Sequence, residues 1–299
     1  MLNQIITKSI SILPKWFAKP FAKAYVAGET NYEAIERIKI LNQKGYSATL
    51  DILGEHTLNK NDSKKYTDQY LELYQEIYNN KLDCNISIKP THIGLDISFD
   101  EALKNFMRIL KASNLHKNFL RIDMEDSKHT NDTFKLYQSL KNDYSGVGVV
   151  VQAYLKRSLR DLEKLHFLGL NARICKGIYN EDSSIAYKNK NEINDNFIKI
   201  ANFMAKHNCY AGYATHDYDL IEKLIENAKK RNLKKSQFEF QVLFGVPMEI
   251  QLEDLLKRGY KVRIYVPFGP NWFDYSIRRI KENPKIIKYV LKNILTKSK

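Results

Sequence analysis

The stretch of residues 85–124 decides the fold, because it contains one complete strand–helix–strand unit. It begins with NISIK at 85–89, continues through the amphipathic run FDEALKNFMRILKA at 99–112, and ends with FLRIDM at 119–124. Short β-branched runs on either side of a helix with one apolar face are typical of two parallel strands joined by a crossover helix. We therefore expect a βαβ unit here.

The same alternation recurs along most of the chain. Eight short apolar runs indicate strands, at 46–53, 85–89, 119–124, 148–153, 172–176, 210–215, 238–243 and 262–266. Helical patterns such as 196–207 and 218–231 fill the gaps between them. Eight parallel strands with intervening helices close into a (β/α)8 barrel, whereas an open doubly wound sheet more often stops at about five to seven strands. The predicted fold class is therefore α/β, a single TIM barrel.

No linker interrupts this series, and 299 residues is a normal length for one barrel. We expect a single domain over residues 1–299, with 1–45 as N-terminal helical additions. The segment 2–24 is amphipathic and is broken by Pro14 and Pro20, so it predicts short docked helices. A longer helix is expected at 32–44, with Gly45 at its end.

Composition excludes several classes of protein. Hydrophobic residues at 43% and charged residues at 27% are ordinary for a globular protein, and no run approaches the roughly 18 apolar residues that span a bilayer. With no secretory signal at the N-terminus, we expect a cytoplasmic protein. The net charge of +14 comes mostly from dispersed Lys. It therefore predicts no nucleic-acid partner, but it leaves peripheral contact with the inner face of the membrane open.

In an α/β barrel the active site lies at the C-terminal ends of the strands, so polar residues there are the candidates. They are Glu55, Lys89, Asp123, Glu125, Gln152, Arg173, Lys176, Thr215, His216, Gln241, Arg263 and Tyr265. The seven His residues never form a close pair, so no metal site is predicted. A Rossmann fingerprint, a Walker loop and a nucleophile elbow are also missing from the sequence.

The stretch RIYVPFGPNWFDYSIRRIKENP at 263–284 carries the most specific chemistry. A turn follows the last strand, and a short helix is predicted at 275–282. Tyr275 lies three and four residues before Arg278 and Arg279, so a phenol and two guanidinium groups share one surface that suits a small carboxylate. The alternative is that both Arg side chains are solvated or paired with Glu282.

Seven collinear motifs and the YxxRR helix at 275–279 resemble the proline dehydrogenase family, both its single-function bacterial enzymes and the dehydrogenase module of bifunctional proline catabolic flavoenzymes. The motifs are ILGE at 52–55, SIKPTHIGL at 87–95, RIDMED at 121–126, VVQAYLKRS at 150–158, RICKGIY at 173–179, YATHD at 213–217 and EFQVLFGV at 239–246. The resemblance implies a distorted barrel with its last helix over the strand ends. It also implies FAD held non-covalently, which would oxidise L-proline to Δ1-pyrroline-5-carboxylate by hydride transfer from carbon five to flavin N5, with a quinone as electron acceptor.

By this resemblance the substrate contacts fall on seven residues. The carboxylate would bind to Lys89, Arg278 and Arg279. Tyr265, Tyr275 and Leu243 would wall the ring. Asp123 would lie near the amine and organise Lys89.

The cofactor contacts implied by the resemblance fall on six residues. The flavin ring would contact Gln152 and Arg173, with Arg173 near N5. The pyrophosphate, ribose and adenine would contact Lys176, Gly177, Thr215 and His216. Arg173, Asp123 and Lys89 are the predicted catalytic residues, while Glu55 and Tyr179 are candidates for gating.

Three residues depart from the family pattern. Ile178 replaces a small Ala and is expected to narrow the pocket, Asp217 replaces an Asn near an anionic cofactor, and Pro90 replaces a Leu after Lys89. Two other functions stay open. A Schiff-base aldolase on the same barrel could use Lys89 or Lys176, and a non-enzymatic basic surface-binding protein would use the net charge.

Overall fold

The computed structural model describes residues 24–273 and 275–277. Its sheet is a closed barrel in which each of eight parallel strands pairs with the next and the last pairs with the first. The strands are β1 (Ser47–Ile52), β2 (Cys84–Ile88), β3 (Leu120–Ile122), β4 (Val147–Gln152), β5 (Asn171–Cys175), β6 (Tyr210–Ala214), β7 (Phe238–Leu243) and β8 (Val262–Phe268). The eight predicted strands and the predicted barrel are confirmed.

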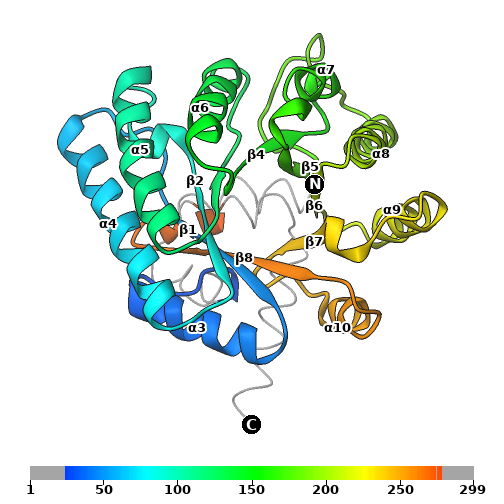
Figure 1. Cartoon of the computed structure of the whole chain (residues 1–299), viewed down its shortest axis with the longest axis horizontal. Coiled ribbons are helices and arrows are strands. Elements are labelled where there is room, and N and C mark those ends of the chain that lie inside the picture. The colour runs from blue at the N-terminus through cyan, green and yellow to red at the C-terminus, as the bar shows by residue number, and fades with distance from the viewer. Residues whose placement is uncertain (1–23, 274, 278–299) are drawn as a thin grey trace, which may run out of the picture.

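Helices surround the barrel on its outer side (Figure 1). The α-helices are α3 (Asn31–Gln43), α4 (Lys60–Asn79), α5 (Phe99–Leu115), α6 (Thr130–Asp143), α7 (Ser158–Glu163), α8 (Lys190–Lys206), α9 (Tyr218–Lys230) and α10 (Glu249–Lys257). Short 3-10 turns are η2 (Pro90–Ile93), η3 (His166–Leu168) and η4 (Lys235–Gln237). Because each crossover helix packs outside the sheet, the loops that follow the strands meet at one end of the barrel.

Local sequence signals set the helix ends. Thr30 and Glu33 form a reciprocal capping box at the start of α3, and Gly45 follows that helix with a φ of +86°, a backbone conformation that favours glycine. Helix α8 begins at Lys190, six residues before the predicted start, because the side chain of Asn189 caps it. The predicted short helices at 2–24 lie largely outside the described residues.

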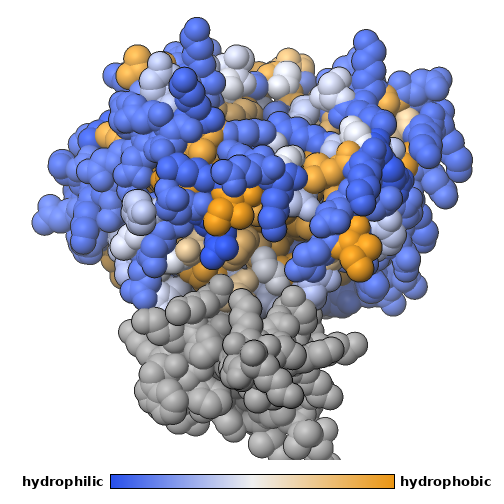
Figure 2. Space-filling view, turned by 90° about the horizontal axis from the view of Figure 1, so that it is seen from below, coloured by the Kyte–Doolittle hydropathy of each residue, from blue (hydrophilic) through white to orange (hydrophobic). Residues whose placement is uncertain are grey.

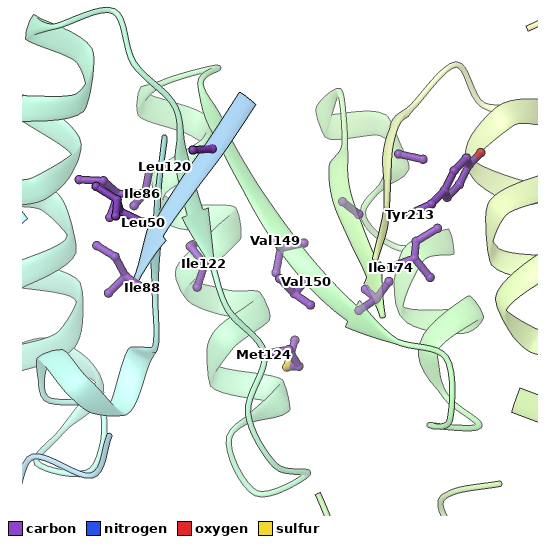
Figure 3. Packing of buried hydrophobic residues seen from close by; sticks show 14 of the residues in the cluster. Leu50, Ile86, Ile88, Leu120, Ile122, Met124, Val149, Val150, Ile174 and Tyr213 are labelled. Carbon is purple, nitrogen blue, oxygen red and sulfur yellow. The ribbon is translucent and has the colours of Figure 1, made fainter. Parts of the chain in front are cut away.

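The hydrophobic core fills the layer between the strands and the helices. Leu50, Ile86 and Ile88 are fully buried or nearly so, and Figure 3 shows them pointing from neighbouring strands toward the helices. Successive side chains of a strand point to opposite faces, so the residues between these apolar positions point into the barrel. The outer faces of the strands are therefore apolar, as parallel strands under a helical layer require.

The barrel interior, in contrast, is polar. Arg263 on β8 donates through Nε to Glu239 on β7 at 2.6 Å, and its NH1 donates to the carbonyl oxygen of Ala48 on β1 at 2.6 Å. Glu239 and Arg263 are 2% and 7% exposed, so this ion pair is buried. Burial opposes ionisation of Glu239, but Arg263 outweighs it and lowers the pKa of that carboxyl to about 2. The ion pair therefore links β7 to β8, and the bond from Arg263 to Ala48 links β8 to β1, where the barrel closes.

The outer surface is mainly hydrophilic on the face drawn in Figure 2, with apolar side chains scattered between charged ones. Within residues 24–273, no helix combines the length and the apolar character that a bilayer crossing needs.

We predict that Glu239→Gln destabilises the protein by about 3–5 kcal/mol, because Arg263 loses its carboxylate partner in the interior. Urea unfolding at neutral pH measures this. Since the pKa of Glu239 is lowered in the folded state, the wild-type pair stabilises the fold above the ordinary Glu pKa of 4.5 and loses this contribution as the pH falls toward about 2. The variant should lack that acid-dependent loss.

The matched control is Glu36→Gln, which removes the exposed pair with Lys39 on α3 and should change stability by less than about 1 kcal/mol. Equal effects of the two substitutions would contradict a structural role for the interior pair.

Candidate active site

A cavity of about 410 Å³ opens at the C-terminal ends of the strands, within the roughly 300–1,000 Å³ of small-molecule sites. Every described residue to which the family resemblance assigns a substrate or cofactor contact lines it, whereas the strand-end candidates Glu55, Glu125 and Arg263 are not among the described residues that do. The lining residues with such an assignment are Lys89, Asp123, Gln152, Arg173, Lys176, Gly177, Thr215, His216, Leu243, Tyr265 and Tyr275. Arg278 and Arg279 lie outside the described residues.

Lys89 ends β2 and is held by Asp51 on β1, with Nζ donating to Oδ2 at 2.8 Å. Burial disfavours the charged ammonium, but Asp51 and Asp123 outweigh it and raise the pKa of Lys89 above its ordinary value. Lys89 is therefore a permanent positive charge in the cavity. Asp51 was not predicted as a site residue, although it lines the cavity and is 1% exposed.

Asp123 and Arg173 form the centre of a network that crosses the barrel. NH1 of Arg173 donates to Oδ1 of Asp123 at 2.8 Å, and its Nε donates to Oε1 of Gln241 at 2.7 Å. The hydroxyl groups of Ser87 and Tyr265 donate to the two oxygens of Asp123, and the Tyr265 ring lies 4.9 Å from the guanidinium carbon of Arg173. These residues come from β2, β3, β5, β7 and β8, so each holds the others in place.

The carboxylates of Asp51 and Asp123 differ electrostatically. Burial raises the pKa of Asp51, and the neighbouring Asp123 adds to this rise while Lys89 opposes it. Burial acts in the same direction on Asp123, but Arg173 and Lys89 outweigh it and lower the pKa of Asp123. Asp123 is therefore the more firmly ionised group. Both of its oxygens accept hydrogen bonds, so Asp123 holds the side chains around it in place.

The side of the cavity formed by β4, β5 and β6 has room and charge for a phosphate-bearing cofactor. Gly177 has a φ of +106°, and a Cβ there would lie 2.1 Å from the Tyr154 ring, so only glycine fits. Lys176 beside it carries a positive charge, and the exposed His216 accepts a hydrogen bond from the backbone of Leu243 at 3.0 Å. The need for glycine at 177 therefore comes from packing against Tyr154, and the lysine beside it is the group that could hold a phosphate.

The three residues that depart from the family pattern, Pro90, Ile178 and Asp217, lie at different places around the cavity. Pro90 is the first residue of η2, where its missing N–H is not needed, so it does not disturb Lys89. Ile178 lines the cavity with 55% of its surface exposed. Asp217 does not point away from the cavity; its Oδ2 accepts from Lys176 Nζ at 2.8 Å. Tyr179 also lines the cavity, whereas Glu55 is not among the described residues that do.

Sequence reasoning missed two polar residues of the network, Asp51 and Ser87, and left a third, Gln241, without a role. Asp51 is the last residue but one of β1, and an isolated carboxylate between the apolar residues Leu50 and Ile52 is the signal that could have found it. Gln241 and Ser87 lie inside strand motifs of the same kind. Gln241 was noted at a strand end but was not assigned a role.

The chain matches the sequence model of the family described as proline dehydrogenase over residues 34–290. It belongs to the proline dehydrogenase family. It is 36% identical over 286 residues to proline dehydrogenase 1 of Bacillus subtilis (strain 168), and the alignment covers 94% of each chain. The proline dehydrogenase of Deinococcus radiodurans is 31% identical over 279 residues, covering 92% of this chain and 90% of that one.

Solved structures show the same barrel in longer chains of this family. Proline utilization A from Bdellovibrio bacteriovorus superposes with a TM-score of 0.82 at 24% identity, over 88% of this chain. The chain spans only 32% of that protein. At this identity the likeness shows the fold alone.

We predict that Asp51→Asn lowers the pKa of Lys89, because Asp51 is the largest of the contributions that raise it. The ε-amine of Lys89 should then react with an amine-specific reagent at lower pH, measured by mass spectrometry of labelled peptides. The exposed Lys81 provides an internal reference whose labelling curve should not move. An unchanged curve for Lys89 would show that Asp51 does not control its charge.

Proposed function

We propose that this protein oxidises L-proline to Δ1-pyrroline-5-carboxylate with non-covalently bound FAD. The observation that carries the proposal is the convergence of Lys89, Asp123, Arg173 and Tyr265 on one cavity in a member of the proline dehydrogenase family. Lys89 and Asp123 would bind and orient the substrate, and Arg173 would contact the flavin. Leu243 and Tyr275 would wall the apolar ring, since both line the same cavity.

The charge balance of the cavity supports a zwitterionic substrate that brings its own carboxylate. The described charges of the lining form three acid–base pairs, Asp51 with Lys89, Asp123 with Arg173 and Asp217 with Lys176. A carboxylate therefore needs further positive charge. Tyr275 lines the cavity, and the sequence places Arg278 and Arg279 three and four residues later, so we assign the clamp to them together with Lys89.

The cofactor side of the cavity fits a flavin dinucleotide in its chemistry. Gln152 and Arg173 would contact the ring. Lys176, Gly177, Thr215 and His216 would hold the diphosphate, ribose and adenine. When bound, FAD supplies the two-electron acceptor for the hydride from carbon five of proline. The guanidinium of Arg173 would favour electron density on the neighbouring flavin ring.

The electron acceptor that we propose is a quinone. Quinones with long tails dissolve in the bilayer, so this part of the proposal carries with it a peripheral contact between the protein and the inner face of the membrane. The excess of basic residues, a net charge of +14, suits an anionic lipid surface.

The geometry argues against the Schiff-base alternative. A Schiff-base lysine must be an unprotonated amine at working pH. Lys89 has its pKa raised by two carboxylates, and Lys176 is paired with Asp217. Lys89 is therefore held as an ammonium ion, and Lys176 is engaged by the Asp217 carboxylate.

We predict that purified protein, supplied with FAD, shows a flavin absorption band near roughly 450 nm that bleaches when L-proline is added without oxygen or acceptor. D-proline provides the control for stereochemical selection and should bleach the band more slowly. A protein that stays colourless after incubation with FAD would contradict the proposed function. Release of FMN instead of FAD on denaturation would contradict the proposed adenine contacts.

The carboxylate clamp is tested by Arg278→Met and Arg279→Met. If the two Arg side chains bind the substrate carboxylate, each substitution removes one partner of that charge pair and keeps much of the side-chain volume. Loss of such a partner costs about 2–5 kcal/mol, so kcat/KM for proline should fall by about thirtyfold to a few thousandfold. Flavin content should hardly change, and pyrrolidine, which lacks the carboxylate, should lose much less. A fall in kcat/KM of less than about fivefold in both variants would contradict the clamp and favour the alternative that both Arg side chains are solvated.

A further inference from the structure

One carboxylate oxygen of Asp217, at the edge of the cavity, is contacted by three donor groups. Oδ2 of Asp217 accepts from Nζ of Lys176 at 2.8 Å, from Nζ of Lys190 at 3.2 Å and from Nδ2 of Asn194 at 3.3 Å. Lys176 follows β5, Asp217 follows β6, and Lys190 and Asn194 lie in the first two turns of α8. The cluster, which we call the Asp217 junction, therefore ties three separate segments of the chain together at the cavity.

The other oxygen of Asp217 has a structural task. Oδ1 accepts from the backbone N–H of Leu220 at 3.4 Å, so Asp217 is the N-cap of α9. Burial opposes its charge, but the hydrogen bonds and charges of Lys176 and Lys190 outweigh burial and lower the pKa of Asp217 well below its ordinary value. The carboxylate is therefore ionised throughout the range in which enzymes of this kind are assayed.

The negative charge of Asp217 partly cancels the positive charge with which Lys176 and Lys190 would attract a diphosphate. Two ammonium groups and one carboxylate leave a net charge of +1 where the lysines alone would provide +2. Lys176 and Asp217 both line the cavity, so a diphosphate that approaches Lys176 also approaches the carboxylate. Like charges within several ångströms repel each other, and the repulsion grows where solvent is excluded.

We propose that Asp217 limits how tightly the site holds the diphosphate of its dinucleotide, by occupying the ammonium groups that the diphosphate would otherwise engage in full. This inference rests on the proposed function. In the absence of the dinucleotide, Asp217 keeps Lys176 and Lys190 in position. When the dinucleotide is bound, the same carboxylate competes for them and speeds its release.

The test is the substitution Asp217→Asn, because Asn caps a helix as well as Asp. Its single amide oxygen can keep the bond from the backbone of Leu220, while an uncharged NH2 takes the place of the oxygen that Lys176 contacts. FAD binding to protein stripped of flavin is followed by quenching of flavin fluorescence. We expect the dissociation constant for FAD to fall on the order of tenfold in the variant. Riboflavin, which has no phosphate, should bind both proteins equally.

The dependence on salt distinguishes charge from structure. Removal of a carboxylate next to the phosphate site should make FAD affinity fall more steeply with added salt, because the attraction is no longer offset. Thermal unfolding of the flavin-free proteins should differ only by the loss of these partly exposed ion pairs, since the cap is kept. Asp182→Asn is the matched control, because Asp182 accepts from the backbone of the nearby Ser184 and is not among the described residues that line the cavity.

Inorganic pyrophosphate, measured by calorimetry, separates this inference from the proposed function. If FAD binds neither protein but pyrophosphate binds the variant more tightly, the flavin assignment fails and the junction stands. If FAD binds both with unchanged or weaker affinity in the variant, Asp217 is a positioning residue for Lys176 and the inference is overturned. Failure of both probes to bind either protein overturns it as well.

Discussion

The pairing of charges inside the closed barrel is the constraint on which the rest of the structure depends. Barrels of this kind are usually filled with branched apolar side chains, whereas this one holds Arg173, Asp123, Glu239 and Arg263 in its interior. A buried charge without a partner costs several kcal/mol, so each acid must meet a base from another strand. The contacts of Arg173 with β2, β3 and β7 satisfy that condition and fix the strands at the same time. The site is rigid because the interior has few other ways to balance its charges.

The fold could be predicted because its signals are local. Each strand is a short β-branched run that ends in a turn, and each helix has an apolar face, so neither depends on distant parts of the chain. Helix α8 is the exception, since its first residues, KNEIND at 190–195, contain one apolar side chain and show little helical periodicity. Its start is set by the cap at Asn189, which a pattern of hydrophobic residues does not reveal.

The site could be predicted only in part, because inward orientation depends on tertiary structure. Asp51 lies in a strand where periodicity of two allows either set of alternating residues to face inward, and pairing of β1 with β8 decides between them. The contacts of Asp217 come from segments 23 and 41 residues away, so the sequence could raise the question of its charge without answering it. Residue type therefore suggested which side chains could belong to the site, and strand pairing in the closed barrel determines which of them face its interior.

The closure of β1 against β8 has a consequence for how the chain is made. Arg263 reaches the carbonyl oxygen of Ala48 across 215 residues of sequence, and no earlier strand can replace β8 in that position. At about 5–20 residues per second, a ribosome needs roughly 10–40 s between the two. Throughout that interval the far edge of β1 has no strand beside it and is open to wrong pairing with other chains. Until the last strand has emerged, nascent chains of this fold therefore avoid wrong pairing only if aggregation is slow or chaperones prevent it.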